Sequence, residues 1–148
     1  MMTDAKTEQP VSLTQHRITV LLVDDRETVR NIGRAMLEHL GFQVIDAGDG
    51  AEAVEIFRRR ADDIRLVLTD LTMPRLNGWE TLKALRDIRP DIPVILASGY
   101  DEPSALAREQ GEGPRAFLSK PYRMADLKKA LARALGDTAP SDEDNRRE

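Results

Sequence analysis

The sequence predicts an α/β fold in which helices cover both faces of a parallel five-stranded sheet. Short apolar runs alternate along the chain with stretches whose apolar residues recur at three-to-four spacing. Several runs are apolar throughout rather than at every second residue, which is typical of parallel strands buried on both faces. Right-handed crossovers between such strands place the helices on the two sides of the sheet.

The five predicted strands follow from apolar runs of three to six residues, each bounded by polar or turn-forming residues. In chain order they are Ile18–Val23, Phe42–Ala47, Leu66–Thr69, Val94–Ala97 and Ala116–Leu118.

Five amphipathic stretches between and after these runs predict helices. Glycine and proline, which favour helix ends and starts, mark the limits of four of them. The stretches are Val29, Ile32, Met36, Leu37 and Leu40, stopped by Gly41; Ala53, Val54 and Phe57; Leu82, Leu85 and Ile88, ending before Pro90; Pro103–Gln110, the weakest, where Asp101 or Glu102 is the candidate cap; and Met124, Leu127, Leu131 and Leu135, stopped by Gly136.

The length of 148 residues fits one domain with tails. Residues 1–16 and 137–148 are polar and lack periodicity, so we expect disordered tails around a domain that spans residues 17–136. The last segment is too short for a helix-turn-helix unit, so no DNA-binding output domain is expected in this chain.

Composition excludes several classes of protein. The absence of cysteine rules out disulfides and thiolate metal sites, and a net charge of −4 argues against direct binding of nucleic acid. No apolar run approaches the ~18 residues that a membrane helix needs, and residues 1–17 lack the apolar core of a secretory signal. We therefore expect a cytoplasmic protein that contacts neither nucleic acid nor membrane directly.

Polar side chains follow four of the five predicted strands. Asp24 and Asp25 come after the first strand, Asp70 after the third, Ser98 after the fourth and Lys120 after the fifth. In open α/β sheets ligands bind beyond the carboxyl ends of the strands, so these groups are expected to meet at one rim. Each residue alone would be an ordinary cap, turn or solvated charge, and the matched chemistry at four strand ends is what indicates a site.

Three neighbouring carboxylates repel one another, and a divalent cation would offset that repulsion. Oxygen ligands without histidine or cysteine favour magnesium or calcium, and the small number of carboxylates favours Mg²⁺. With Lys120 and Ser98 beside the metal, the rim suits a tetrahedral anion. A carboxylate there could attack phosphorus and form an aspartyl phosphate.

Four segments make the sequence recognisable: VLLVDDRETVR, LVLTDLTMPRLNGWE, VILASGY and FLSKPY. In order and spacing they resemble the signatures of response-regulator receiver domains, and the resemblance covers residues 17–136. It implies a flavodoxin-like doubly wound sheet of order 2-1-3-4-5. It also implies a phosphoacceptor switch of a two-component or phosphorelay system rather than an enzyme. The implied phosphodonor is a sensor histidine kinase or a histidine phosphotransfer protein, and the downstream protein target is unknown.

The resemblance also implies roles for individual residues. Asp70 would be the phosphoacceptor, and Mg²⁺ would be held by Asp25, Asp70 and the backbone carbonyl of Thr72, with Asp24 acting mostly through water. Lys120 would contact the phosphoryl group. The Met-Pro and Asn-Gly pairs that follow Asp70 predict a tight loop that would bring the Thr72 carbonyl to the metal.

A second group of residues would carry the signal. Ser98 matches the switch hydroxyl and Phe117 the switch aromatic, so the face formed by the helix at Pro103–Gln110, the fifth strand and the last helix would change on phosphorylation. The Lys120–Pro121 bond matches one that is usually cis in the family, as proline permits. Thr72 and Tyr100 would border the path of the hydrolytic water and tune the phosphorylated lifetime. Arg26-Glu27 is a departure, because many receivers have an acidic residue and proline there.

Three other functions compete with this interpretation. An aspartate-nucleophile phosphatase needs a second acid two residues after the nucleophile, where this chain has Thr72. A flavin or dinucleotide domain needs a glycine- or hydroxyl-rich loop after the first strand, where this chain has DDRETVR. A degenerate receiver acting as a constitutive interaction module is disfavoured because the key residues are present. A stand-alone regulator, a phosphorelay intermediate and a fragment of a hybrid kinase all stay open.

Overall fold

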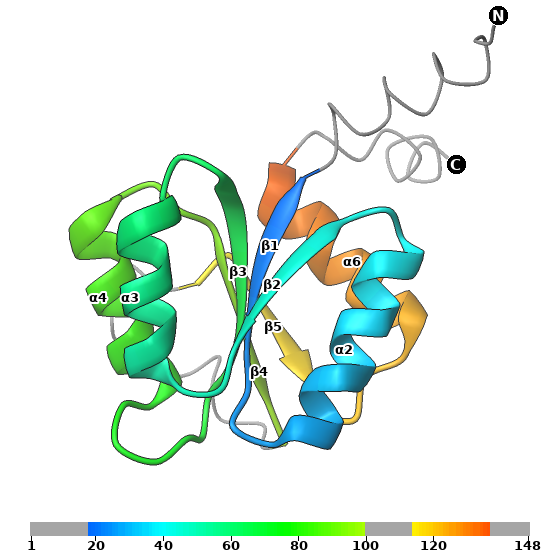
Figure 1. Ribbon diagram of the computed structural model, residues 1–148. Coiled ribbons are helices and arrows are strands. Elements are labelled where there is room, and N and C mark those ends of the chain that lie inside the picture. Colours follow the sequence, from blue (N-terminus) through cyan, green and yellow to red (C-terminus); the bar gives the residue numbers. More distant parts are fainter. Residues whose placement is uncertain (1–17, 100–113, 137–148) are drawn as a thin grey trace, which may run out of the picture.

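The structure, a computed structural model, describes residues 18–99 and 114–136. Its centre is a five-stranded parallel sheet in the order β2-β1-β3-β4-β5, which confirms the predicted order (Figure 1). The strands are β1 (Thr19–Val23), β2 (Gln43–Ala47), β3 (Ile64–Asp70), β4 (Val94–Ser98) and β5 (Ala116–Ser119).

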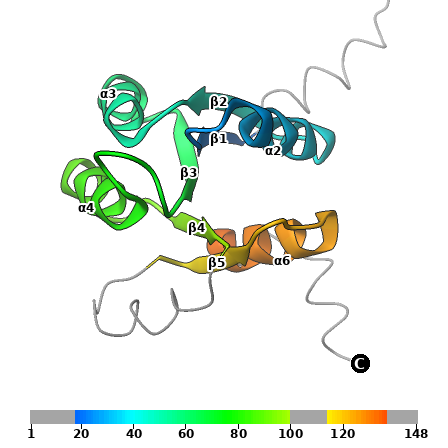
Figure 2. The ribbon, with the colours of Figure 1, turned by 90° about the horizontal axis from the view of Figure 1, so that it is seen from below.

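Helices cover both faces of the sheet, as the alternating pattern predicted. Helices α2 (Glu27–His39) and α6 (Met124–Leu135) lie on one face, and α3 (Gly50–Arg60) and α4 (Gly78–Ile88) lie on the other (Figure 2). The described residues contain these four helices rather than the five predicted. The predicted helix at Pro103–Gln110 lies outside the described residues, as do Tyr100 and the two segments predicted to be disordered tails.

The central strands are buried on both sides, which explains their continuous apolar runs. In β1, Val20 and Leu22 pack in the core beneath α2 and α6, whereas Leu21 and Val23 pack in the core beneath α3 and α4. Successive side chains of a strand point to opposite faces, so each apolar residue contributes to one of the two cores. Phe57 of α3 is completely buried in the second of these cores.

Strand β3 is longer than the predicted run Leu66–Thr69. It begins at Ile64, which is completely buried, and continues through Arg65, whose side chain is exposed. The charged Arg65 interrupts the apolar pattern, so the apolar run in the sequence begins only at Leu66 and omits Ile64. At the other end the strand includes Asp70, so this carboxylate is held by the sheet rather than by the following loop.

No helix within the described ranges is long and apolar enough to cross a membrane.

Candidate functional site

Strand register brings the predicted polar residues to one edge of the sheet. Val23 is paired with Thr69, so Asp24 and Asp70 follow at the same level of two neighbouring strands. Asp70 is in turn paired with Ala97, the residue before Ser98. At this edge the neighbouring strands β1 and β3 are followed by helices on opposite faces of the sheet, α2 and α4. Ligand sites in open α/β sheets usually lie at such a position.

Three carboxylates form an acidic cluster at this edge. One carboxylate oxygen each from Asp24, Asp25 and Asp70 can be chosen so that the three lie within 4.8 Å of one another. Asp24 and Asp70 are buried, whereas Asp25 is exposed and faces solvent. An oxygen-only set of this size fits a hard divalent cation such as Mg²⁺, which retains several of its waters.

Lys120 joins the two buried carboxylates. Its Nζ donates hydrogen bonds to Asp24 Oδ2 at 3.0 Å and to Asp70 Oδ1 at 2.9 Å, and its side chain is only 11% exposed. The backbone places this ammonium, because the Lys120 N–H donates to the Ser98 carbonyl at 2.8 Å and thereby extends the β4–β5 pairing. The bond between Lys120 and Pro121 is cis.

The local electrostatics make Asp70 reluctant to ionise. Burial raises the pKa of the Asp70 carboxyl above its ordinary value of 3.8, and the hydrogen bond and positive charge of Lys120 oppose that rise. The charges of Asp24 and Asp25 raise the pKa further. The same cluster acts on Tyr122, whose pKa is raised to about 12 by burial first and then by the charges of Asp24 and Asp70. Added positive charge at this edge would therefore favour the ionised Asp70.

A tight loop fixes the backbone on either side of Asp70, as the Met-Pro and Asn-Gly pairs predicted. The Leu71 N–H donates to the Ala97 carbonyl at 2.8 Å, and the Gly78 N–H donates to the Leu71 carbonyl at 2.8 Å. A Cβ at Gly78 would lie 2.7 Å from Leu71 Cα and 2.8 Å from the Asp70 carbonyl oxygen, so only glycine fits there. Thr72 is exposed within this loop.

The residues predicted to carry the signal lie on the next two strands. Ser98 is the last residue of β4 and is 3% exposed. Phe117 lies in β5, is half-buried, and packs on the core beneath α3 and α4. Tyr100, the other predicted residue of this region, lies outside the described residues.

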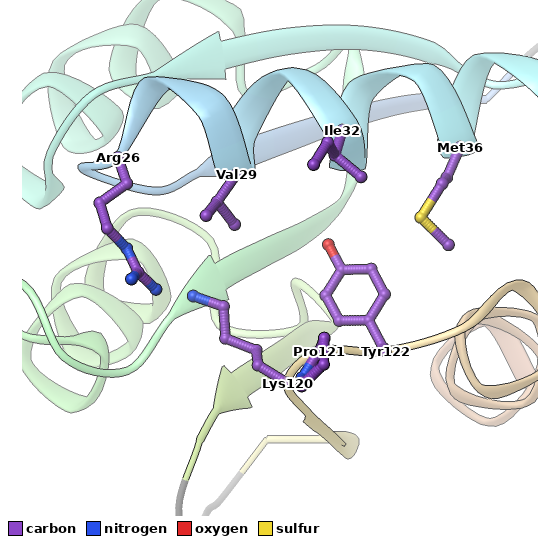
Figure 3. Close-up of a pocket in the computed structure, with 7 residues that line it drawn as sticks. All are labelled: Arg26, Val29, Ile32, Met36, Lys120, Pro121 and Tyr122. Carbon is purple, nitrogen blue, oxygen red and sulfur yellow. The ribbon is translucent and has the colours of Figure 1, made fainter.

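A pocket beside the acidic cluster was not expected from the sequence. It has a volume of about 290 Å³ and lies between α2 and the segment that follows β5 (Figure 3). Ile32 belongs to the apolar stripe that predicted the first helix, but it is 57% exposed and lines this pocket. Helical spacing identifies the face of a helix, whereas only the packing of Tyr122 and its neighbours shows where that face is left uncovered. The residues that line the pocket are Arg26, Val29, Ile32, Met36, Lys120, Pro121 and Tyr122.

Comparison with known proteins assigns this arrangement to a family. The family described as Response regulator receiver domain matches residues 20–132 of the chain. The chain belongs to this family. As a receiver it is a signalling domain of two-component systems, which agrees with the resemblance drawn from its four sequence segments.

Individual relatives are similar in sequence and in structure. The receiver is 36% identical to the sensor kinase CckA of Brucella abortus (strain 2308) over 109 residues, 74% of this chain and 12% of that protein. It resembles a receiver domain protein from Clostridium thermocellum with a TM-score of 0.73 and 30% identity, covering 80% of this chain and 94% of that one.

A third similar structure was solved with its metal ion. It is the receiver domain of the sensor histidine kinase PA1611 of Pseudomonas aeruginosa PAO1, with a magnesium ion coordinated in its active-site cleft. The TM-score is 0.70 at 28% identity, and the match covers 82% of this chain and 99% of that one. Receivers of this kind thus bind Mg²⁺, and the acidic cluster of this chain offers suitable ligands.

Proposed function

We propose that this receiver is a phosphoacceptor switch in which Asp70 accepts a phosphoryl group from the phosphohistidine of a sensor histidine kinase or a histidine phosphotransfer protein. The observation that carries the proposal is the buried contact of Lys120 with Asp24 and Asp70 beside the exposed carboxylate of Asp25. Similarity to sensor kinases supports the choice of donor. The family and the proposed chemistry describe a signalling domain rather than a classical enzyme.

In the proposed transfer, an Asp70 carboxylate oxygen forms a bond to phosphorus while the bond between phosphorus and the donor's histidine nitrogen breaks. The imidazole leaves with that electron pair and takes a proton from solvent. Lys120 is already within hydrogen-bond distance of Asp70 and would turn one donor to the incoming phosphoryl oxygens. The rigid loop after β3 holds Asp70 in place during the transfer.

Magnesium is the proposed cofactor. Asp25, Asp70 and the Thr72 carbonyl would hold it directly and Asp24 mostly through water, and the bound ion would neutralise charge on the phosphoryl group. The chain's own contribution is to gather the carboxylates before the ion arrives, at a cost that is visible in the raised pKa of Asp70.

The proposed signal begins with the charge of the phosphoryl group, roughly −1.5 to −2, at the edge of the sheet. The Ser98 hydroxyl would move toward a phosphoryl oxygen, and the Phe117 ring would turn inward to fill the space that is vacated. The partner-binding face would then change over β5, α6 and the segment at 103–110. This is a two-state element biased by a local charge.

The test is intact-mass measurement after incubation with acetyl phosphate and Mg²⁺. The wild-type chain and the control Asp62→Asn, at an exposed loop position, should gain one phosphoryl group, whereas Asp70→Asn should gain none. Excess chelator should abolish the adduct in the wild type and in Asp62→Asn. Undiminished labelling of Asp70→Asn would refute the acceptor, and undiminished labelling of the wild type in chelator would refute the role of the metal.

A further inference from the structure

Arg26 directly follows the acidic pair and precedes the first residue of α2. Its backbone N–H donates to Asp24 Oδ1 at 2.9 Å, so the main chain of Arg26 is tied to the acidic cluster. Arg26 occupies the N-cap position, but its side chain makes no capping hydrogen bond. The guanidinium is therefore anchored close to the site by its backbone while its own donors are uncommitted.

The two other cations that contact the acidic pair and its backbone, Lys120 and Arg30, are already paired. Lys120 contacts Asp24 and Asp70. Arg30 donates to the Asp24 carbonyl at 2.7 Å and lies 3.5 Å from Asp46, which also accepts from Arg34 at 3.0 Å.

Among the residues that the structure describes, none forms an ion pair or hydrogen bond with the Arg26 guanidinium. Its donors therefore remain available to an incoming anion.

Arg26 and Lys120 line the same pocket of about 290 Å³, and both side chains extend toward the same end of it (Figure 3). The rest of the lining is mostly apolar, with Val29, Met36 and Pro121 among its residues. The polar end of the pocket is thus the end beside Asp70, which Lys120 contacts.

Charge is the obstacle to a phosphodonor at this edge. Three carboxylates gather there, and Lys120 is the buried cation that offsets them. A small phosphodonor is itself an anion and is repelled by the exposed Asp25. A guanidinium presents a planar fork of donors that matches the oxygens of a phosphate, and it stays charged throughout the accessible pH range.

We propose that Arg26 binds the oxygens of small anionic phosphodonors and makes the receiver prefer donors of higher negative charge, acyl phosphates in particular. The proposal rests on the proposed function of Asp70. With acetyl phosphate, an Asp70 oxygen bonds to phosphorus, the bond from phosphorus to the bridging oxygen breaks, and acetate leaves with the electron pair. No proton transfer is needed. Arg26 positions the donor and takes no part in the bond changes.

The experiment compares two donors that differ in charge. Near neutral pH acetyl phosphate is a dianion and phosphoramidate a monoanion. Phosphorylation rates of the full chain are measured against donor concentration at saturating Mg²⁺, for wild type, Arg26→Gln and Arg26→Lys. Arg65→Gln is the matched control, because Arg65 is exposed near the amino end of β3, away from the edge that carries Asp70.

Arg26→Gln should raise the half-saturating concentration of acetyl phosphate about fivefold. This loss of binding corresponds to about 1 kcal/mol, the upper range for an exposed charge pair. The maximal rate should stay unchanged, and the effect on phosphoramidate should be less than half as large. Arg26→Lys, which keeps the charge but not the planar fork of donors, should recover part of the loss, and added salt should reduce the difference. Arg65→Gln should match wild type.

Equal behaviour of Arg26→Gln and Arg65→Gln toward acetyl phosphate would overturn the proposal. So would an equal loss with both donors, because a distorted site would produce that result without any selectivity for charge. If the wild-type chain accepts no phosphoryl group at Asp70 from either donor, the proposed function and this inference both fail. If Asp70 is labelled normally in every variant, only the inference fails.

Discussion

The indole ring of Trp79 lies against the phenyl ring of Phe117, with ring centroids 6.1 Å apart and ring planes inclined by 60°. Trp79 belongs to the first turn of α4, which starts directly after the loop that follows Asp70, and Phe117 belongs to the edge strand β5. The indole N–H is buried and has no hydrogen-bond partner in the described part of the chain. The contact therefore joins the loop of Asp70 to the proposed switch aromatic.

This contact makes the single tryptophan a reporter of Phe117. Because an aromatic neighbour shapes the emission of an indole, beryllofluoride with Mg²⁺ should change the fluorescence of Trp79, and Phe117→Ala should remove most of that change. Phe42→Ala, at a position that packs on the opposite core, is the control and should retain it. A full response in Phe117→Ala would show that Trp79 senses the ion itself.

Ser98→Ala should separate phosphorylation from signalling. We expect Asp70 still to be labelled, because the hydroxyl does not take part in the bond changes. Beryllofluoride should no longer produce large chemical-shift changes in β5 and α6, since the hydroxyl that couples the phosphoryl group to Phe117 is gone. Ser119→Ala, at an exposed position ending β5, should behave as wild type. Full shifts in Ser98→Ala would mean that the hydroxyl-to-aromatic coupling is wrong.

Asp70→Asn should stabilise the fold near neutral pH. Burial raises the folded-state pKa of Asp70 above 3.8, so ionising this carboxyl lowers the free energy of unfolding as pH rises through that pKa. Lys120 keeps Asp24 as a partner in the variant. We expect a gain in stability at about pH 7 that shrinks as pH falls through the folded-state pKa of Asp70, because the wild-type carboxyl then becomes protonated as well.

Urea unfolding at several pH values measures this gain, with Asp62→Asn as an exposed control that should change little. A gain that is the same at all pH values would show that ionisation of Asp70 is not its cause.

Gly78→Ala should destabilise the protein and disturb the site together. The added Cβ would press on Leu71 Cα and the Asp70 carbonyl oxygen, so we expect a loss of about 1–3 kcal/mol and slower labelling of Asp70. Gly48→Ala is the matched control, because its Cβ would make an ordinary 3.5 Å contact with Glu52, and it should cost less than about 0.5 kcal/mol. Equal unfolding midpoints for the two variants would contradict the close packing at Gly78.

Tyr100→Ala should shorten the lifetime of the phosphorylated state. The side chain two residues after Ser98 is expected to shield the acyl phosphate from in-line attack by water, and Thr72 is expected to shield it from the other side. The half-life is followed by the decay of the phosphorylated mass after the donor is removed. An equal or longer half-life in the variant would contradict shielding by Tyr100.

Local patterns in the sequence were enough to predict the strands, most helix ends and the edge of the sheet that carries the site. Buried parallel strands need apolar side chains on both faces, so their runs showed in the sequence, and Gly41 and Gly136 marked helix ends where the backbone takes φ of +100° and +74°. Polar residues at the strand ends were also readable, because every parallel strand of one sheet ends at the same edge. The sheet order came from the family resemblance rather than from the pattern.

Tertiary packing decided which of these residues meet. Lys120 reaches Asp24 across 96 positions of sequence, and no periodicity encodes that distance. The apolar spacing that includes Ile32 predicted a helix, and the neighbouring elements leave Ile32 itself exposed. The pairing of Trp79 with Phe117 likewise depends on how α4 and β5 share one face of the sheet. Sequence spacing records which face of an element is apolar, whereas burial and charge pairing depend on what covers that face, and only the folded chain determines this.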